Sequence, residues 1–386
     1  AAITHSAMEI YEGNHLAQFP LDIFQTGSGT STNMNMNEVI SSLSSTEVDS
    51  VHPNDHVNMG QSSNDVIPSA INVDSSLTVV NQLLPSITYL KNSIDEKAKS
   101  IGDIPKNGRT HLMDAMPVTF AQEMSAWSAQ INDAMEQYQV LLTKLQQLAI
   151  GGTAVGTGVN ADPNLAKQCC IHMNKLTGME FRPANNSFQA ISSQDASLML
   201  SSCNRTLAVA LTKISNDLRW MNSGPLGGLG EITLPALQPG SSIMPGKVNP
   251  VIPESVCMVA SQVLGNDLTI THAAQSGNFQ LNVMLPLIAH NLSESLSLLS
   301  SACMSLADKA IKDFEVNQEN IQFMLNKNPI LATALNATIG YETGAQIVKK
   351  AYNEKRSIID VASEMTDLDS DTLSQILDPV KLTRNQ

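Results

Sequence analysis

The stretch TFAQEMSAWSAQINDAMEQYQVLLTKLQQLAI (119–150) carries large apolar residues at steps of three and four. This spacing lines them up along one face of an α-helix, so it predicts a single long amphipathic helix. The residues on that face are Phe120, Met124, Trp127, Ile131, Met135, Tyr138, Leu142, Leu145 and Leu148.

The same period recurs over residues 193–222, where the apolar positions again advance by three or four. Ser192 or Ser193 can cap the start of this helix, and Gly224-Pro225 is expected to stop it. Its apolar face is expected to consist of Met199, Cys203, Leu207, Leu211, Ile214, Leu218 and Met221.

Two further helices are expected, one from Pro253 to Gly265-Asn266 and one over about residues 278–308. Few stretches show the alternation of apolar and polar residues that is typical of β-strands. Several long amphipathic helices joined by short polar loops predict an all-α fold, built as a long-helix bundle with small helical flanking domains.

The chain has 386 residues, which is long for one compact domain. We expect three parts. They are a remnant of an N-terminal domain over residues 1–59, the central long-helix bundle over 60–318, and a small C-terminal helical domain over 319–386.

Composition and charge exclude several classes of partner. The formal net charge of −14 repels nucleic acid and anionic membranes, so neither is expected to bind.

The five cysteines are odd in number and form no CxxC pair, which predicts reduced thiols in a cytosolic type of compartment. No apolar run approaches the length of a membrane span.

Four loops rich in small polar residues break the helical pattern. Hydroxyls, amides and free backbone N–H groups suit a carboxylate or oxyanion, although helix caps and turns use the same residues. Four such loops in one chain, with a lysine and a histidine among them, favour an anion site. The loops are Gly27–Thr30, Gln61–Asp65, Gly108–His111 and Gly240–Pro250.

Two glycine-rich segments suggest nucleotide binding, but neither meets the requirements. Gly240 and Gly246 enclose five residues where a phosphate-binding loop has four, and Val248 stands where Ser or Thr would hold magnesium. The segment GGTAVGTG (151–158) follows a predicted helix rather than a strand, so a tight turn between helices is favoured. We expect no cofactor, and no cluster of residues has the spacing of metal ligands.

The segment GSSIMPGKVNP (240–250) closely resembles the signature of the fumarase/aspartase superfamily. Four other segments resemble class II fumarases and follow in the order of that family. They are QTGSGTSTNMNMNEV (25–39), VHPNDHVNMGQSSNDV (51–66), GRTHLMDAMPVTFAQE (108–123) and GGTAVGTGVN (151–160). The resemblance covers essentially the whole chain.

This resemblance implies a fold, an activity and an assembly. The activity is the metal-free and cofactor-free addition of water to fumarate to give malate, a step of the tricarboxylic acid cycle. The assembly is a homotetramer with a core of long helices, in which each active site draws on three subunits. The implied location is the cytoplasm, or the mitochondrial matrix for a eukaryotic source.

The N-terminal part departs from the family pattern in two ways. The first helical segment of the family is absent, so Ala1 is expected to lie inside a truncated N-terminal domain. The stretch from Glu38 to Val51 is short, and Asp49 and Ser50 stand where family members often carry basic residues. This loss of positive charge weakens the case for a second, peripheral anion site on His52, Pro53, Asn54 and Asp55.

The resemblance also implies a role for each residue of the site. Ser241 is the general base, acting as an alkoxide that needs N–H donors and a nearby cation. Lys247 and Asn249 stabilise the aci-carboxylate, and His111 is the general acid or positions water, with Glu254 as its partner. The residues implied to hold the substrate are Ser28, Gly29, Thr30, Ser62, Ser63, Asn64, Thr110, Ser242 and Val248.

Each of these roles has a plain structural alternative. Ser241 could be an ordinary loop hydroxyl, His111 a structural histidine, and Glu254 a first-turn acid favoured by the helix dipole. Arg109 is expected to form a structural pair and is not assigned to substrate.

Two other functions remain open. Aspartate ammonia-lyase shares most of these loops and the anti-elimination chemistry, but residues 223–242 and 249–267 resemble fumarases more closely. A non-catalytic scaffold, like the crystallins of this superfamily, is disfavoured because Ser241, Lys247, Asn249 and His111 are all present. An iron–sulfur fumarase is excluded, since nothing resembles its cluster-binding cysteines.

Overall fold

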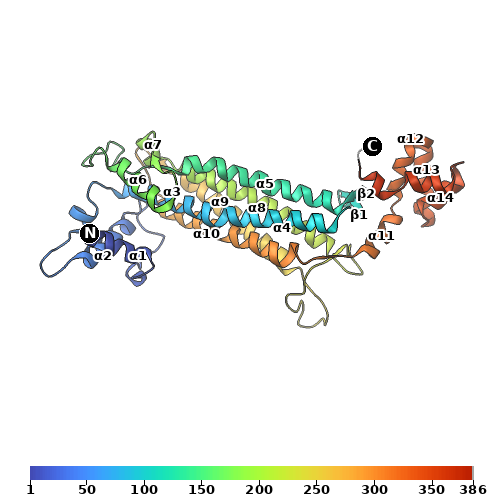
Figure 1. Cartoon of the computed structure of the whole chain (residues 1–386), viewed down its shortest axis with the longest axis horizontal. Helices are drawn as coiled ribbons and strands as arrows, with labels where there is room; N and C mark the ends of the chain where they lie inside the picture. The colour runs from blue at the N-terminus through green and yellow to red at the C-terminus, as the bar shows by residue number, and fades with distance from the viewer. Residues whose placement is uncertain (385–386) are drawn as a thin grey trace. The chain divides into compact units, whose positions relative to one another are not determined.

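The computed structural model describes residues 1–384, most of which lie in α-helices (Figure 1). The contacts divide the chain into two compact units, each built from three separate stretches of sequence. Unit 1 comprises Ala1–Ile87, Asp133–Val209 and Met258–Ala302. Unit 2 comprises Thr88–Asn132, Ala210–Cys257 and the residues from Cys303 onward.

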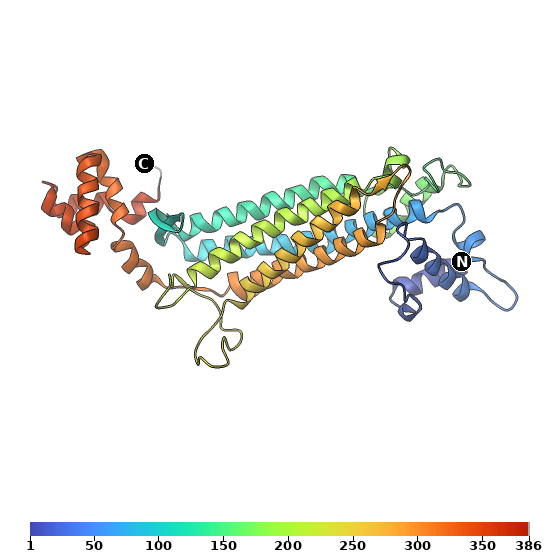
Figure 2. The ribbon, with the colours of Figure 1, turned by 180° about the vertical axis from the view of Figure 1, so that it is seen from behind.

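Five long helices contribute segments to both units. Within each unit these segments run side by side (Figure 1, Figure 2), and their inward faces are apolar and almost completely buried. Each buried Leu or Ile contributes roughly 1.5–3 kcal/mol through its removal from water. The predicted all-α long-helix bundle is confirmed by α4 (Leu84–Ile101), α5 (Phe120–Leu145), α8 (Asp195–Met221), α9 (Val251–Ala274) and α10 (Leu285–Leu306).

The helix expected over residues 119–150 ends earlier, at Leu145, and Leu148 lies in the strand β3 (Gln147–Leu148). The predicted apolar residues on α5 are buried, except that Met135 and Leu142 are only half-buried. On α8, Met199 is 45% exposed, whereas the other predicted members of its face are buried. The predicted serine cap of α8 is wrong. A separate short helix, α7 (Ser187–Ser192), occupies that position and is closed by the Ser193 N–H, which donates to the Gln189 carbonyl.

The predicted end of α9 at Gly265-Asn266 is also wrong, because the helix continues to Ala274. Asn266 is 3% exposed, and its side-chain amide donates to Glu294 (2.8 Å) and Ser295 (3.1 Å) on α10. These contacts with a neighbouring helix favour the helical conformation over the stop that glycine and asparagine would otherwise signal.

The helix expected over 278–308 begins later, at Leu285. The preceding residues form a two-stranded hairpin of β6 (Gly277–Asn278) and β7 (Leu281–Asn282). The Asn282 side chain then accepts the Met284 N–H at 2.9 Å, which satisfies a donor just before α10.

The remaining elements of unit 1 are short helices and one small parallel pair of strands. A local core formed by Leu148, Ile150, Cys170, Met179 and Phe181 packs beneath them. The elements are α1 (Ala2–Tyr11), a 3₁₀ turn (Leu16–Gln18), α2 (Thr30–Ser44), α3 (Ser63–Thr78), α6 (Leu165–Thr177), two π-helical turns (Pro53–Val57 and Val79–Leu83), β3 (Gln147–Leu148) and β4 (Arg182–Pro183).

Unit 2 contains an antiparallel hairpin, β1 (Pro105–Thr110) and β2 (Met113–Thr119). It also contains the pair β5 (Ile232–Thr233) and β8 (Glu315–Val316). Its other elements are a π-helical turn (Ala307–Ile311), α11 (Gln318–Asn326), a 3₁₀ turn (Pro329–Leu335), α12 (Asn336–Ile339), α13 (Tyr341–Glu354), α14 (Ile358–Met365), α15 (Ser370–Ile376) and α16 (Pro379–Leu382).

The C-terminal helices share an apolar core of their own, centred on Leu335, Ile347, Val361 and Leu373, each no more than 1% exposed. The three-part division into 1–59, 60–318 and 319–386 nevertheless stays a prediction. Across residues 1–384, no helix combines the length and the apolar character that crossing a membrane requires.

Candidate active site

The signature loop between α8 and α9 is closed on itself by backbone and amide hydrogen bonds. The Gly240 N–H donates to the Lys247 carbonyl (2.9 Å), and the Asn249 side chain donates to the Gly240 carbonyl (2.8 Å). A Cβ atom on Gly240 would lie 2.3 Å from the Lys247 oxygen, so only glycine fits there. Figure 2 shows this segment as an open loop, and residues 242–248 are exposed.

Ser241 follows Gly240 in this loop. Its Oγ accepts hydrogen bonds from the backbone N–H groups of Ile243 (3.2 Å) and Met244 (3.0 Å). Two N–H donors aimed at one hydroxyl oxygen stabilise negative charge on it. Ser242 is the next residue, yet within the described chain its hydroxyl makes no such contact.

The loop leads directly into the N-terminus of α9. Glu254 lies in the first turn of this helix, where its N–H donates to the Pro250 carbonyl at 3.1 Å. The helix N-terminus adds partial positive charge to a segment that already carries Lys247 and the Asn249 amide. One continuous segment therefore carries the hydrogen-bond donors Lys247 and Asn249 at its start and the Glu254 carboxylate at its end.

His111 occupies the tip of the β1–β2 hairpin. Thr110 pairs with Met113, so His111 and Leu112 form the two-residue turn, with φ of 55° and 61°. Both values are in the left-handed region, which such a turn requires but which favours Asn and Gly. The His111 ring is exposed, and within residues 1–384 no hydrogen bond or ion pair joins it to Glu254.

In unit 1, the segment Ser28–Thr30 forms a compact polar turn at the start of α2. The hydroxyls of Ser28 and Thr30 are 2.7 Å apart and share a hydrogen bond. Gly29 has φ 72°, and a Cβ atom there would meet the Ile67 side chain at 2.9 Å. Glycine at this position therefore keeps the two hydroxyls next to each other.

Ser62 and Asp65 form a reciprocal cap at the start of α3. The Ser62 Oγ accepts the Asn64 N–H (3.2 Å), and the Ser62 N–H donates to Asp65 Oδ1 (3.0 Å). The Asn64 amide donates to the Ala154 carbonyl (2.8 Å), and Ser63 is 8% exposed. Part of the hydrogen-bonding capacity of this predicted binding segment is therefore used within the fold.

The structure also reveals a residue that the sequence analysis missed. Asp65 is completely buried, and its Oδ2 accepts the N–H groups of Gly151 (2.9 Å) and Thr153 (2.8 Å). Burial raises the pKa of this carboxyl, against the opposing effect of its N–H donors. The available signal was its position three residues after Ser62, which is typical of a capping box.

The segment His52–Asp55 forms the first part of a π-helical turn. The His52 Nδ1 accepts the N–H groups of Asn54 (3.3 Å) and Asp55 (3.1 Å), and the Asp55 carboxylate lies 3.3 Å from the same nitrogen. These contacts occupy Nδ1 within the turn, so Nε2 is the ring nitrogen left for a ligand. The predicted second anion site remains untested.

The predicted site residues are thus divided between the units. Unit 1 holds Ser28, Gly29, Thr30, Ser62, Ser63 and Asn64, together with the segment 52–55. Unit 2 holds Thr110, His111, Ser241, Ser242, Lys247, Val248, Asn249 and Glu254. Among the described residues, no group of three or more His, Cys, Asp or Glu side chains is arranged to hold a metal ion.

The long helices carry hydroxyl-rich loops and a lysine-bearing glycine loop, and comparison with known proteins identifies this combination as that of a helical lyase. Residues 1–265 match the lyase family, and residues 331–384 match the fumarase C C-terminus. The class II fumarate hydratase of Xylella fastidiosa is 55% identical over 382 residues, which cover 99% of this chain and 81% of that protein. The Thermus thermophilus protein of the same name is 46% identical over 389 residues, covering 99% and 84%.

Solved structures agree with the sequence matches. The class II fumarase from Schistosoma mansoni superposes with a TM-score of 0.96 at 40% identity, covering 99% of this chain and 84% of that one. The chain belongs to the class II fumarase family, so the resemblance that its motifs carry is confirmed.

Proposed function

We infer that this chain catalyses the reversible addition of water to fumarate, giving malate. The observation that carries the proposal is the environment of Ser241. A serine hydroxyl is a poor base in water, and it becomes an effective one only where its anionic form is stabilised. The N–H groups of Ile243 and Met244, aimed at the Ser241 Oγ at 3.2 and 3.0 Å, supply that stabilisation.

In the direction of dehydration, the Ser241 alkoxide takes the proton from the carbon next to one carboxylate of malate. The electrons of that C–H bond move into the carboxylate, which becomes a doubly charged aci-carboxylate. Lys247 and Asn249 stabilise this species more than the ground state, which is the condition for accelerating the reaction. The electrons then form the double bond, and hydroxide leaves from the neighbouring carbon as water with a proton from His111.

The neutral donors hold the two carboxylates of the substrate. In the assembly proposed below, more than one subunit supplies these hydroxyls and amides. They belong to Ser28, Thr30, the segment 62–64, Thr110 and Ser242. Gly29 and Val248 contribute backbone groups. Neutral donors suit a site in which Lys247 already provides one strong positive charge.

We propose that the sites are completed in a homotetramer. Within the described residues 1–384, no hydrogen bond or ion pair joins Glu254 and His111, which are expected to be partners. The helix α9 also leaves Met258 (67%), Leu264 (39%) and Leu268 (61%) exposed, and contact with another subunit would bury these apolar side chains. Light scattering should give the mass of a tetramer, and a fully active monomer would contradict this proposal. A location in the cytoplasm stays a prediction.

Ser241→Ala tests the proposed base, with Ser242→Ala as the matched control, because the two serines are adjacent and chemically identical. Loss of the base should reduce kcat on the order of a hundred- to ten-thousand-fold with little change in KM. Loss of a carboxylate donor should change mainly KM. A larger loss of turnover in Ser242→Ala would show that the base has been assigned to the wrong serine.

Assays with fumarate in the presence and absence of ammonium, with a chelator added throughout, distinguish the hydratase from an ammonia-lyase. Malate should form without ammonium, and no aspartate should appear with it. Formation of aspartate, or activity that returns only when a metal ion is added, would overturn the proposed reaction.

A further inference from the structure

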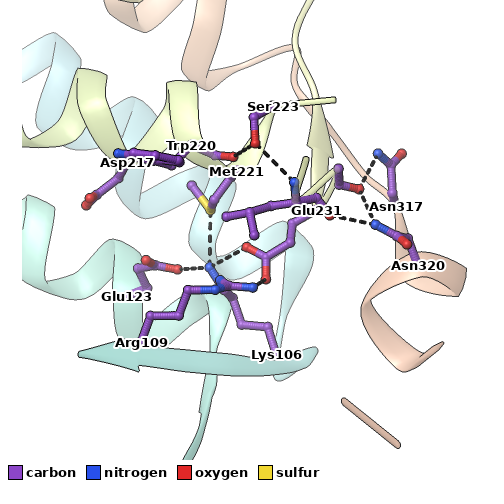
Figure 3. Close-up of polar contacts among 12 residues, drawn as sticks. Lys106, Arg109, Glu123, Asp217, Trp220, Met221, Ser223, Glu231, Asn317 and Asn320 are labelled. Carbon is purple, nitrogen blue, oxygen red and sulfur yellow. Dashed lines mark hydrogen bonds and ion pairs between the residues drawn. The ribbon is translucent and has the colours of Figure 1, made fainter. Parts of the chain in front are cut away.

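Lys106, on strand β1, is a buried cation that the proposed mechanism does not use. Its side chain is 2% exposed, so its charge has to be compensated within the protein. The Nζ donates to Glu123 Oε2 (2.5 Å), lies 3.0 Å from Glu231 Oε2, and contacts the Met221 sulfur at 3.2 Å. Figure 3 shows these groups converging on the lysine.

Glu231 connects this lysine to the end of the same strand. Its second oxygen, Oε1, accepts a hydrogen bond from Arg109 Nη2 at 2.8 Å, and Glu231 is only 3% exposed. Residues three apart on a regular strand face opposite sides of the sheet. The register of β1 with β2 shifts between Asn107 and Arg109, and such a bulge redirects side chains, here to the same carboxylate.

The backbone of Glu231 is itself held on both sides. Its N–H donates to the Met221 carbonyl (2.8 Å) at the end of α8, and its carbonyl accepts the Asn317 N–H (2.9 Å). The Asn317 and Asn320 side chains donate to the neighbouring Gly230 carbonyl at 2.9 and 3.1 Å (Figure 3). These hydrogen bonds fix the position of Glu231, and its carboxylate holds the Arg109 side chain by the ion pair described above.

The strand that Arg109 anchors ends in the strained turn at His111 and Leu112. Left-handed backbone conformation is unfavourable for residues other than Gly and Asn, and two such residues in a row persist only where the surrounding structure holds them. Gly108, next to Arg109, supports the same geometry, because a Cβ atom there would lie 2.4 Å from the Met116 carbonyl oxygen. A fixed strand and a strained turn together give His111 one position.

We propose that Glu231 and Arg109 are positioning residues, which hold the β1–β2 hairpin so that His111 meets the substrate. Neither side chain touches the reacting atoms. Their effect on the reaction passes through the backbone of residues 109–111 to the imidazole. The inference rests on the proposed function, because it concerns the residue that delivers the proton in that reaction.

A double-mutant cycle with His111 separates positioning from general damage. Arg109→Gln removes the link to the turn but leaves the contacts of Lys106 with Glu123 and Glu231. We expect it to lower kcat about tenfold to a hundredfold with little change in KM, as for a displaced acid. In the His111→Asn background the same change should lower kcat less than twofold, because the residue it positions is already absent. Arg109→Lys should recover part of the activity.

The matched control is Asp267→Asn, which breaks another arginine–carboxylate pair, formed by Arg205 and the buried Asp267 at 2.7 Å. It should leave kcat unchanged in both backgrounds. Full turnover of Arg109→Gln, or an equal loss with and without His111, would overturn the positioning role. An unsubstituted protein that fails to hydrate fumarate would instead overturn the proposed function.

Discussion

Each of two four-residue charge clusters in unit 2 contains a glutamate that bridges a lysine and an arginine, but the two clusters differ in exposure. The second acid pairs with the lysine in one cluster and with the arginine in the other. In the first, Glu231 bridges Lys106 and Arg109, and Glu123 is the second acid. In the second, Glu364 bridges Lys350 (2.8 Å) and Arg356 (2.5 Å), and Glu354 is the second acid. The side chains of Lys106 and Glu231 are 2% and 5% exposed, whereas those of Lys350 and Glu364 are 36% and 45% exposed.

The two clusters differ in how much stability is lost when one of their charged residues is removed. Water can replace a lost partner in the exposed cluster, so its pairs add little to stability. In the buried cluster, removal of one acid leaves a cation without compensation in a medium of low dielectric constant. The same residue types therefore contribute little to stability at the surface, at residues 350–364. In the buried cluster they hold the strand at residues 106–109 in place.

The largest effect is expected from comparing Glu231→Gln with Glu364→Gln. Loss of the buried carboxylate should lower the free energy of unfolding by about 3–5 kcal/mol, because Lys106 and Arg109 both lose their shared partner. Loss of the exposed carboxylate should leave the urea midpoint almost unchanged. Equal shifts for the two variants would show that burial is not what distinguishes the clusters.

Comparing Lys106→Met with the double variant Lys106→Met/Glu123→Leu tests whether these charges can be replaced by apolar side chains. Lys106→Met should destabilise the protein by about 3 kcal/mol, since Glu123 and Glu231 then lack their common cation. Adding Glu123→Leu should recover part of this loss, because apolar side chains can replace a buried ion pair. Urea denaturation of both variants measures the recovery. A double variant that is less stable than the single one would contradict this reasoning.

The sequence predicted the long helices because their stability depends on local period and burial. The sequence did not predict where α9 ends, because that depends on residues far away in the chain. Asn266 stays helical because its side chain donates hydrogen bonds to Glu294 and Ser295 on α10. The candidate site was predicted from motifs, since Ser241 and His111 lie in segments that resemble a known family. Lys106 lies outside the segments that carry the resemblance, and nothing in the segment 223–242 distinguishes Glu231 as a partner of that lysine. Only the fold brings these two residues, 125 positions apart, into contact.

A third prediction extends the comparison to pH, using the buried Asp65. Burial raises its pKa above the ordinary value of 3.8, so the folded state binds the proton more tightly than the unfolded state does. Its contribution to stability is therefore complete below pH 3.8 and is lost as pH rises through the higher, folded pKa. Asp65→Asn lacks this titration.

The stability of the unsubstituted protein relative to Asp65→Asn should therefore decrease from pH 4 to pH 7, measured as the difference in urea midpoint. Asp267→Asn, which also removes a buried carboxylate, serves as the control for general loss of packing. A difference that increases with pH would mean that the N–H groups of Gly151 and Thr153 outweigh the effect of burial.

The smallest effect, of opposite sign, is expected from Glu364. Hydrogen bonds from Arg356 and Lys350 lower the pKa of this carboxyl to about 2 from 4.5. Its contribution is therefore present above pH 4.5 and is lost as pH falls towards 2. The small difference in midpoint between the unsubstituted protein and Glu364→Gln at pH 7 should shrink at pH 3.

The effect of salt on the stability differences distinguishes the exposed cluster from the buried one. In 1 M salt the Debye length is about 3 Å, so the exposed pairs of Glu364 are screened and the difference for Glu364→Gln should disappear. Ions do not reach the buried pair of Lys106 and Glu231, so the loss caused by Glu231→Gln should survive the same salt. If 1 M salt abolished both differences, the cluster at residues 106–109 would be open to solvent, and it could not hold the His111 turn in one position.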